Sequence, residues 1–193
     1  MTPNGYYTGG ITINGNQCLD YTVSLVDNDP ILDASGQPVY SHNPTNSAIK
    51  GNIITYQTAY DDVSIKKYMA ANNLTGYITT TSKSGYKYYY KILTPGTGTD
   101  PISLSSTVGV QYTGYLFNGT AFDTEVTTDG TAATSFTLYD VADGFSDGLT
   151  HTTAGGVISI IMPSALGYGD PAYQAIPAFS CLRFDITVVS VTN

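Results

Sequence analysis

The sequence predicts an α+β domain in which a short helix covers one face of an antiparallel sheet. Three observations support this class. Two-residue alternation of apolar and polar side chains begins near residue 85, one short helical segment lies among strand-like segments, and Gly- or Pro-rich turns separate them. The chain has 193 residues, which suits one domain with an extension. We assign residues 81–193 to the domain and residues 1–80 to an N-terminal extension of unknown role.

Six segments of the domain have strand-like patterns. Alternating apolar side chains indicate half-buried strands at the start and at the end of the domain. Residues 157–162 form an almost continuous apolar run that stops at Pro163, as is typical of a central strand. Asn118-Gly119 is the preferred dipeptide of a two-residue hairpin turn. The expected strands are residues 86–92, 108–116, 121–123, 135–138, 157–162 and 182–188.

Two helices are expected, one in the extension and one in the domain. The first covers about residues 61–72, where apolar residues at i, i+3 and i+4 form one narrow stripe. This stripe favours packing against another surface over a binding role. The second covers residues 145–152 and stops before Gly155-Gly156. The stripe of the first helix consists of Ile65, Tyr68 and Met69. Either Asp61 or Asp62 can cap its N-terminus.

The extension also contains two strand-like segments. Residues 20–26 alternate apolar and polar side chains, and residues 51–57 are expected to form a second strand. A loose stretch rich in Gly, Asn and Thr precedes them. Nothing in residues 1–60 identifies a ligand.

The charge of the chain is low and unevenly distributed. Charged residues make up 11% of the sequence, against about 25% in typical soluble domains. The net charge is −8, and residues 92–193 hold nine acidic residues and a single base, Arg183. Because such a surface repels nucleic acids and anionic lipids, we exclude nucleic-acid binding as a main activity. The sequence also has no run of 18 apolar residues that could span a membrane.

The cysteines and histidines do not have the spacing of a metal site. Cys18 and Cys181 are far apart in sequence, and His42 and His151 lie in unrelated contexts. We therefore predict no metal and no cofactor. One long-range disulfide is an option, and two unpaired buried thiols fit the sequence at least as well.

Several fragments of the domain occur together in one order. They are Gly96-Thr97-Gly98, Val110-Gln111-Tyr112-Thr113-Gly114, Asn118-Gly119-Thr120-Ala121-Phe122-Asp123, Phe136-Thr137-Leu138, Val141-Ala142-Asp143-Gly144-Phe145, residues 162–169, Ile176-Pro177 and Leu182-Arg183-Phe184-Asp185. In this order they resemble the FKBP family of peptidyl-prolyl cis–trans isomerases. The resemblance implies an antiparallel sheet of five to six strands wrapped around a short helix. Residues 62–89 are similar to the segment before this domain in some exported Bacteroidetes-type members.

The resemblance also implies an apolar pocket that accepts a proline ring. In it, the Ile176 N–H and the Tyr168 hydroxyl hold carbonyls that flank the proline, while Asp123 and the Tyr112 hydroxyl orient the rotating carbonyl. Taken singly, the aromatic residues are more typical of core positions, and only the joint pattern indicates a pocket. The implied catalytic residues are Tyr112, Phe122, Asp123, Phe145, Tyr168, Ile176 and Phe184. The implied substrate-binding residues are Phe136, Val141, Ala142 and Tyr173.

Four positions depart from the family's pattern. The pocket floor, usually Trp, is Phe145, and the chain contains no Trp. Thr134 and Ala142 stand where the family often has an aromatic residue and Ile. Tyr173 replaces a histidine on a slightly shorter loop. These changes predict a wider, shallower pocket with reduced activity and weak affinity for macrolide inhibitors.

The sequence therefore predicts a peptidyl-prolyl isomerase that acts on proline-containing polypeptides, favours basic flanks and assists the folding of exported proteins. The alternative is an FKBP-like binding or chaperone module with little catalysis, which the altered pocket favours. A third hypothesis is a surface protein in which residues 1–60 carry the function. We expect a bacterial monomer in the cell envelope, periplasmic or lipid-anchored, with Met1 marking the site of a removed leader.

Overall fold

A computed structural model describes the backbone of residues 47–193 and the side chains of residues 57–193. The predicted α+β class is confirmed, whereas the strand expected at residues 20–26 lies outside the described residues. The elements are α1 (Ser47–Ala71), β1 (Ile78–Thr81), β2 (Lys87–Thr94), β3 (Thr107–Leu116), β4 (Ala121–Glu125), β5 (Thr134–Thr137), the 3₁₀ turn η1 (Leu138–Asp140), α2 (Asp143–Leu149), β6 (Val157–Met162), the 3₁₀ turn η2 (Ser164–Leu166) and β7 (Leu182–Thr192).

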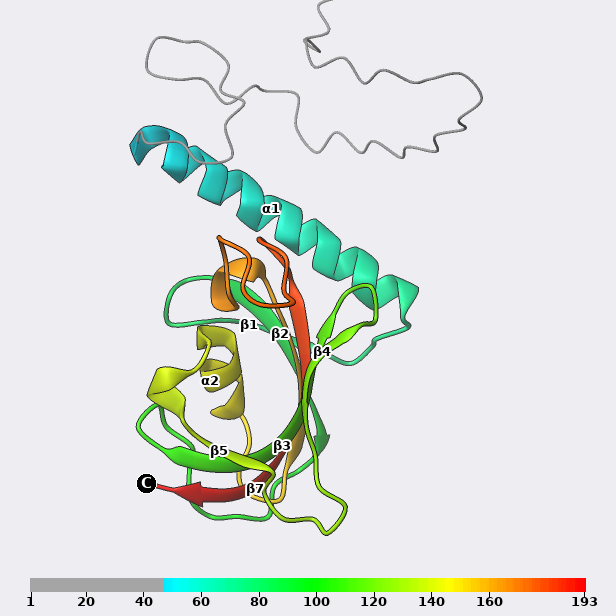
Figure 1. Cartoon of the computed structure of the whole chain (residues 1–193), viewed down its shortest axis with the longest axis vertical. Coiled ribbons are helices and arrows are strands. Elements are labelled where there is room, and N and C mark those ends of the chain that lie inside the picture. Colours follow the sequence, from blue (N-terminus) through cyan, green and yellow to red (C-terminus); the bar gives the residue numbers. More distant parts are fainter. Residues whose placement is uncertain (1–46) are drawn as a thin grey trace, which may run out of the picture. The chain divides into compact units, whose positions relative to one another are not determined.

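Seven strands of the described region form one antiparallel sheet in the order β1-β2-β6-β7-β3-β4. The seventh, β5, pairs with the first half of β3, while β4 pairs with its second half. The sheet curves around α2, which lies on its inner side (Figure 1). The short edge strand β1 was not expected from the sequence.

The inner face of the sheet carries the main hydrophobic core. The predicted alternation is confirmed on β2 and β7, where every second side chain packs into this core. β6 is buried on both faces: Ile160 belongs to the inner core, and Ile161 packs under α1 on the outer face. This double burial explains why the sequence of β6 is almost wholly apolar.

The helix α2 lies unusually close to β6 because two glycines, one helical turn apart, face the strand. A Cβ atom on Gly148 would lie 2.3 Å from the Cδ1 atom of Ile160, and one on Gly144 would lie 2.6 Å from the Sδ atom of Met162. The helix expected at residues 145–152 begins and ends earlier, at Asp143 and Leu149. Residues 150–152 continue from it as a tighter turn with i→i−3 hydrogen bonds.

The helix of the extension is longer than expected. Residues 51–57 belong to α1, so their assignment to a strand was wrong. The β-branched pair Ile53-Ile54 gives this stretch local strand propensity. A strand needs a partner, however, whereas a helix pairs its backbone groups within its own segment.

The predicted capping role of Asp61 or Asp62 was also wrong, because both residues lie well inside α1. Asp61 is 1% exposed and caps a different element. Its Oδ2 atom accepts hydrogen bonds from the Ser164 N–H at 2.8 Å and the Ser164 hydroxyl at 2.7 Å, at the start of η2. Its Oδ1 atom accepts a third from the Gln57 amide at 2.6 Å.

The apolar stripe of α1 packs against the outer face of the sheet, as predicted. Ile65 is 1% exposed and contacts a small core formed with Tyr89, Ile161 and Cys181. The Cys181 thiol is free and buried, and burial raises its pKa. Its candidate disulfide partner, Cys18, lies outside the described residues.

Replacement of Asp61 by Ala should destabilise the fold by about 2–4 kcal/mol, because two buried donors of Ser164 lose a charged acceptor. Urea unfolding monitored by tyrosine fluorescence measures the free energy of unfolding. The matched control is Asp62→Ala on the same helix, whose carboxylate forms a half-exposed ion pair with Lys66 and accepts the Tyr89 hydroxyl at 3.0 Å, and whose loss should destabilise the fold less. Equal losses for the two variants would contradict the capping role of Asp61.

A polar cluster lies beside the end of α2. The hydroxyl of the fully buried Tyr88 is 2.7 Å from the Nε2 atom of His151, whose ring stacks on Tyr90 at a centroid distance of 3.9 Å. Burial raises the pKa of Tyr88, so its hydroxyl stays protonated within hydrogen-bond distance of Nε2. Burial lowers the pKa of His151 below its usual 6.5, and the charge of Asp147 opposes this change.

The titration of His151 should therefore make the folded state less stable at low pH. Its depressed pKa means that the unfolded chain binds a proton more readily than the folded chain, so stability is lost as pH falls through about 6.5. His151→Gln keeps an acceptor for Tyr88 but does not titrate. Urea unfolding at a series of pH values from about 8 to 5 should show a smaller loss for this variant than for the wild type. Parallel pH profiles for the two proteins would refute the assignment.

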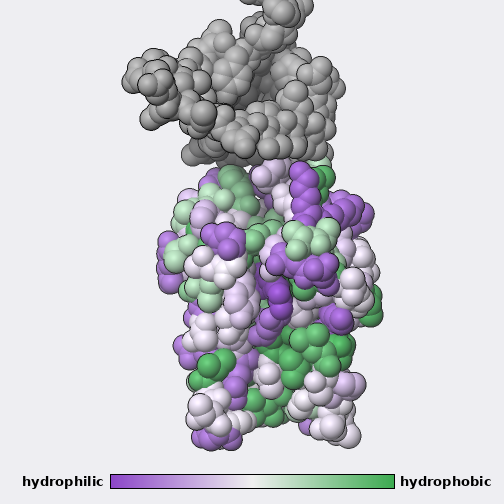
Figure 2. Space-filling view, turned by 90° about the vertical axis from the view of Figure 1, so that its right-hand side faces the viewer, coloured by the Kyte–Doolittle hydropathy of each residue, from purple (hydrophilic) through white to green (hydrophobic). Residues whose placement is uncertain are grey.

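The surface of the described region mixes polar and apolar residues. Figure 2 shows the face at the right of Figure 1, where hydrophilic residues are spread widely and hydrophobic residues gather in the lower part. Among the large hydrophobic side chains, Tyr139 is 82% exposed. No helix among residues 47–193 is long and apolar enough to cross a membrane.

Candidate functional site

A cavity of about 540 Å³ opens between α2 and the inner face of the sheet. Its lining residues are Tyr112, Asp123, Ser135, Phe136, Thr137, Asp140, Val141, Ala142, Phe145, Tyr168, Tyr173 and Phe184. Nine of the eleven residues implied by the family resemblance are in this set. The other two, Phe122 and Ile176, line a smaller cavity of about 120 Å³ that shares Asp123, Tyr168 and Tyr173 with the first.

The floor of the cavity is a cluster of aromatic rings around Phe145. Phe145 is 4% exposed and meets Tyr112, Phe136 and Phe184 at near-perpendicular interplanar angles of 81°, 82° and 86°. The ring centroids lie 5.3–5.9 Å apart, which is the favourable edge-to-face arrangement. These contacts hold Phe145 in one orientation, so the floor is preformed.

Gly114 on β3 leaves room for two rings of this region. A Cβ atom at this position would lie 2.5 Å from Cζ of Phe122 and 2.9 Å from Cε1 of Phe184. The two rings pack edge to face at 5.5 Å. Any side chain on Gly114 would therefore push one of them into the neighbouring cavities.

The wall formed by β3 and β4 carries a phenol paired with a carboxylate. The Tyr112 hydroxyl donates a hydrogen bond of 2.5 Å to Oδ2 of Asp123. Burial, together with the charge of Asp123, raises the pKa of Tyr112, so the phenol keeps its proton. Tyr112 is 7% exposed while Asp123 is exposed, so the pair joins the buried floor to the mouth of the cavity.

Two stacked tyrosines form the rim. The rings of Tyr168 and Tyr173 lie 4.8 Å apart at an interplanar angle of 7°. Tyr168 is 38% exposed, and no other described residue bonds to its hydroxyl. Burial raises the pKa of Tyr168, with a contribution from Tyr173, so this hydroxyl remains a donor.

The structure gives the Ile176 N–H another partner than the expected substrate carbonyl. This N–H donates a hydrogen bond of 2.8 Å to the Tyr173 carbonyl, and the return bond from the Tyr173 N–H measures 2.9 Å. Both close a tight turn in which Gln174 has a φ of 49°. A different donor is available at Ala142, which lines the cavity and whose N–H bonds to no acceptor among the described residues.

The altered positions differ in their effect on the cavity. Ala142 and Phe145 line it, whereas Thr134 starts β5 opposite Val110 and does not. The opening expected at Thr134 is therefore outside the site. Sequence reasoning missed Ser135, Thr137 and Asp140, which have no pattern that distinguishes them from surface residues. Within residues 47–193 no group of His, Cys, Asp and Glu side chains could hold a metal ion.

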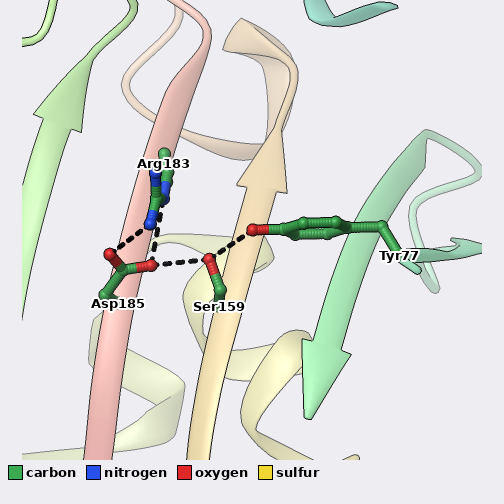
Figure 3. A network of polar contacts seen from close by, with 4 residues as sticks. All are labelled: Tyr77, Ser159, Arg183 and Asp185. Carbon is green, nitrogen blue, oxygen red and sulfur yellow. Dashed lines mark hydrogen bonds and ion pairs between the residues drawn. The ribbon is translucent and has the colours of Figure 1, made fainter. Parts of the chain in front are cut away.

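The strand that carries Phe184 is fixed from its other face. Arg183 Nη2 and Nε donate to the two carboxylate oxygens of Asp185 at 2.6 and 3.0 Å. Ser159 on β6 donates to Asp185 at 2.6 Å and accepts from the Tyr77 hydroxyl at 2.8 Å (Figure 3). Since neighbouring residues of a strand point to opposite faces, this network sets the register of Phe184.

Comparisons with known proteins agree with this architecture. A family model described as FKBP-type peptidyl-prolyl cis-trans isomerase matches residues 98–189. A crystal structure of FkpA from Escherichia coli superposes with a TM-score of 0.56 and 30% identity, covering 76% of this chain and 65% of that one. A peptidyl-prolyl cis-trans isomerase from Pseudomonas syringae gives a TM-score of 0.55 at 26% identity, covering 70% of this chain and 96% of that one.

Curated relatives match the same region. The FKBP-type isomerase FkpA of Buchnera aphidicola (Schizaphis graminum) is 37% identical over 112 residues, which cover 58% of this chain and 44% of the relative. FkpA of Escherichia coli K12 is 35% identical over 102 residues, covering 53% of this chain and 37% of the relative. This chain therefore spans less than half of each of these two relatives. The C-terminal part of the chain, residues 98–189, thus matches the family of FKBP-type peptidyl-prolyl cis-trans isomerases.

The close packing of Phe122 and Phe184 against Gly114 can be tested by substitution. Gly114→Ala should destabilise the fold by about 1–3 kcal/mol because the new methyl group overlaps Phe122 and Phe184. In a Phe122→Ala background the same change should cost less, since the nearer ring is gone. Free energies of unfolding for the wild type, both single variants and the double variant give the coupling. Strict additivity would show that the ring does not occupy this position.

Proposed function

We propose that the chain is a peptidyl-prolyl cis–trans isomerase that acts on X–Pro bonds in flexible polypeptides. The observation that carries the proposal is the preformed aromatic cavity of about 540 Å³ with the Tyr112–Asp123 pair in its wall. Aromatic side chains on the floor of the cavity suit a proline ring, and the polar groups of its wall and rim can contact the flanking amides. The match of residues 98–189 to the isomerase family supports the same activity.

The reaction needs no bond cleavage. Rotation about a peptide bond faces a barrier of about 18–20 kcal/mol, since the planar amide is stabilised by resonance. The carbonyl oxygen of a planar amide carries more negative charge than that of a twisted amide. A carboxylate such as Asp123 near this oxygen therefore disfavours the planar form more than the twisted form, which lowers the barrier.

The floor and rim complete the site. The rings around Phe145 exclude water from the amide and hold the proline. The Tyr168 hydroxyl and the Ala142 N–H are the donors available for the carbonyls that flank the rotating bond. When the flanking carbonyls are held in place, rotation about the X–Pro bond is the motion that remains.

The direct test is isomerisation of a proline-containing tetrapeptide, followed by NMR exchange. Asp123→Asn and Phe145→Leu should each lower kcat/KM by at least about tenfold, because the first removes the charge at the wall and the second reshapes the floor. Asp100→Asn, an exposed carboxylate outside the cavity, is the charge-matched control and should keep the wild-type rate.

A binding module remains the competing function, favoured by the smaller Ala142 and Phe145 side chains of the lining. A folded wild-type protein that binds the peptide without accelerating exchange would establish this alternative and refute catalysis. The two outcomes are separated by measuring peptide binding and exchange on the same sample.

The biological setting is also a proposal. We infer an isomerase of the bacterial cell envelope, periplasmic or lipid-anchored, that assists exported proteins, works as a monomer and binds macrolides weakly. The sparsely charged, tyrosine-rich composition supports the location. Fractionation of the source cells and light scattering of the purified protein test these two points.

A further inference from the structure

The turn η1 carries an acid that lines the cavity and, next to it in the chain, an exposed aromatic residue. Asp140 lines the cavity and is exposed, and no hydrogen bond or ion pair engages its side chain within the described residues. Its neighbour Tyr139 has 82% of its surface exposed, although large aromatic residues are usually buried. Neither side chain contributes to the hydrophobic core.

Among the described residues no cation pairs with Asp140. The cavity lining contains the carboxylates of Asp123 and Asp140 and no basic residue. Asp123 already accepts the Tyr112 hydroxyl. The sole base after residue 91, Arg183, is paired with Asp185 on the other face of β7. The carboxylate at η1 is therefore left without a counter-charge at the place where a substrate chain would pass.

We propose that Tyr139 and Asp140 select X–Pro bonds that have a Lys or Arg residue close to the proline. The cation would pair with the Asp140 carboxylate and lie on the face of the Tyr139 ring, two interactions that both require a positive charge. The catalytic part of this proposal rests on the isomerase function proposed above. The preference in binding does not depend on it.

The expected preference is moderate because η1 is exposed. An exposed ion pair and an exposed cation–π contact each change an affinity by a factor of roughly two to five. An acidic residue at the same place is repelled by a similar amount. We therefore expect an overall Lys-over-Glu ratio of roughly tenfold at low salt, and a smaller ratio at about 0.5 M salt because exposed charges are screened.

The experiment uses two sets of peptides that differ at one position, either directly before or directly after the proline. Each set contains Lys, Gln and Glu variants. For every peptide, NMR titration of the labelled full chain gives Kd, and exchange spectroscopy on the same sample gives kcat/KM. In at least one set the wild type should bind Lys most tightly, Gln less and Glu least.

Variants of the turn identify the residues responsible. Asp140→Asn should lower the Lys-over-Glu ratio to roughly the two- to fivefold that the Tyr139 ring supplies, and Asp140→Lys should lower it further. Tyr139→Leu should weaken the preference for Lys over Gln. Asp100→Asn removes an equal charge outside the cavity and should keep the wild-type ratio, which separates a local effect from one of net charge.

The outcomes distinguish the two proposals. Equal binding of the three peptides in both sets, no detectable binding of any, or an unchanged ratio in Asp140→Asn would overturn the charge selection. Equal acceleration of all peptides would retain the isomerase and overturn the selection. A binding preference that depends on Asp140, without acceleration of exchange, would retain the selection and overturn the isomerase function.

Discussion

The close approach of α2 to β6 is the constraint on which the rest of the site depends. Gly144 and Gly148 present no side chain to the strand, so the helix backbone lies against Met162 and Ile160. This distance places Phe145 at the centre of the aromatic cluster, with ring contacts to β3, β5 and β7 at once. A helix set further from the sheet would leave Phe145 without these contacts, and the cavity would lose its floor.

The polar groups of the domain are arranged around this apolar centre in two layers. On the inner side, the Tyr112–Asp123 pair reaches from the buried floor to the mouth of the cavity. On the outer side, Arg183, Asp185 and Ser159 satisfy one another and hold β6 and β7 in register. Arg183 and Asp185 neutralise each other on the outer side. The carboxylates of the cavity lining, Asp123 and Asp140, have no such basic partner in that lining.

Periodicity in the sequence predicted the strands well because burial on one face imposes a two-residue repeat, as on β2 and β7. The pocket followed from the ordered motifs, and nine of its implied residues line the cavity. The errors have local causes. Residues 51–57 have strand propensity but no partner strand, and Asp61 looked like a cap although its acceptors serve Ser164, far along the chain. The turn hydrogen bond of the Ile176 N–H was not foreseen, because such a bond leaves no pattern in the sequence.

The bond from Asp61 to Ser164 has a consequence for how the molecule divides into folding units. It joins a helix that begins at residue 47 to the turn that leads directly into the rim residue Tyr168. A fragment starting at residue 81 would keep every residue of the cavity, yet it would expose Ile161 and leave the Ser164 amide without its acceptor. The helix therefore supports the turn next to the rim of the cavity, and the structural unit is larger than the residues 98–189 that match the family model.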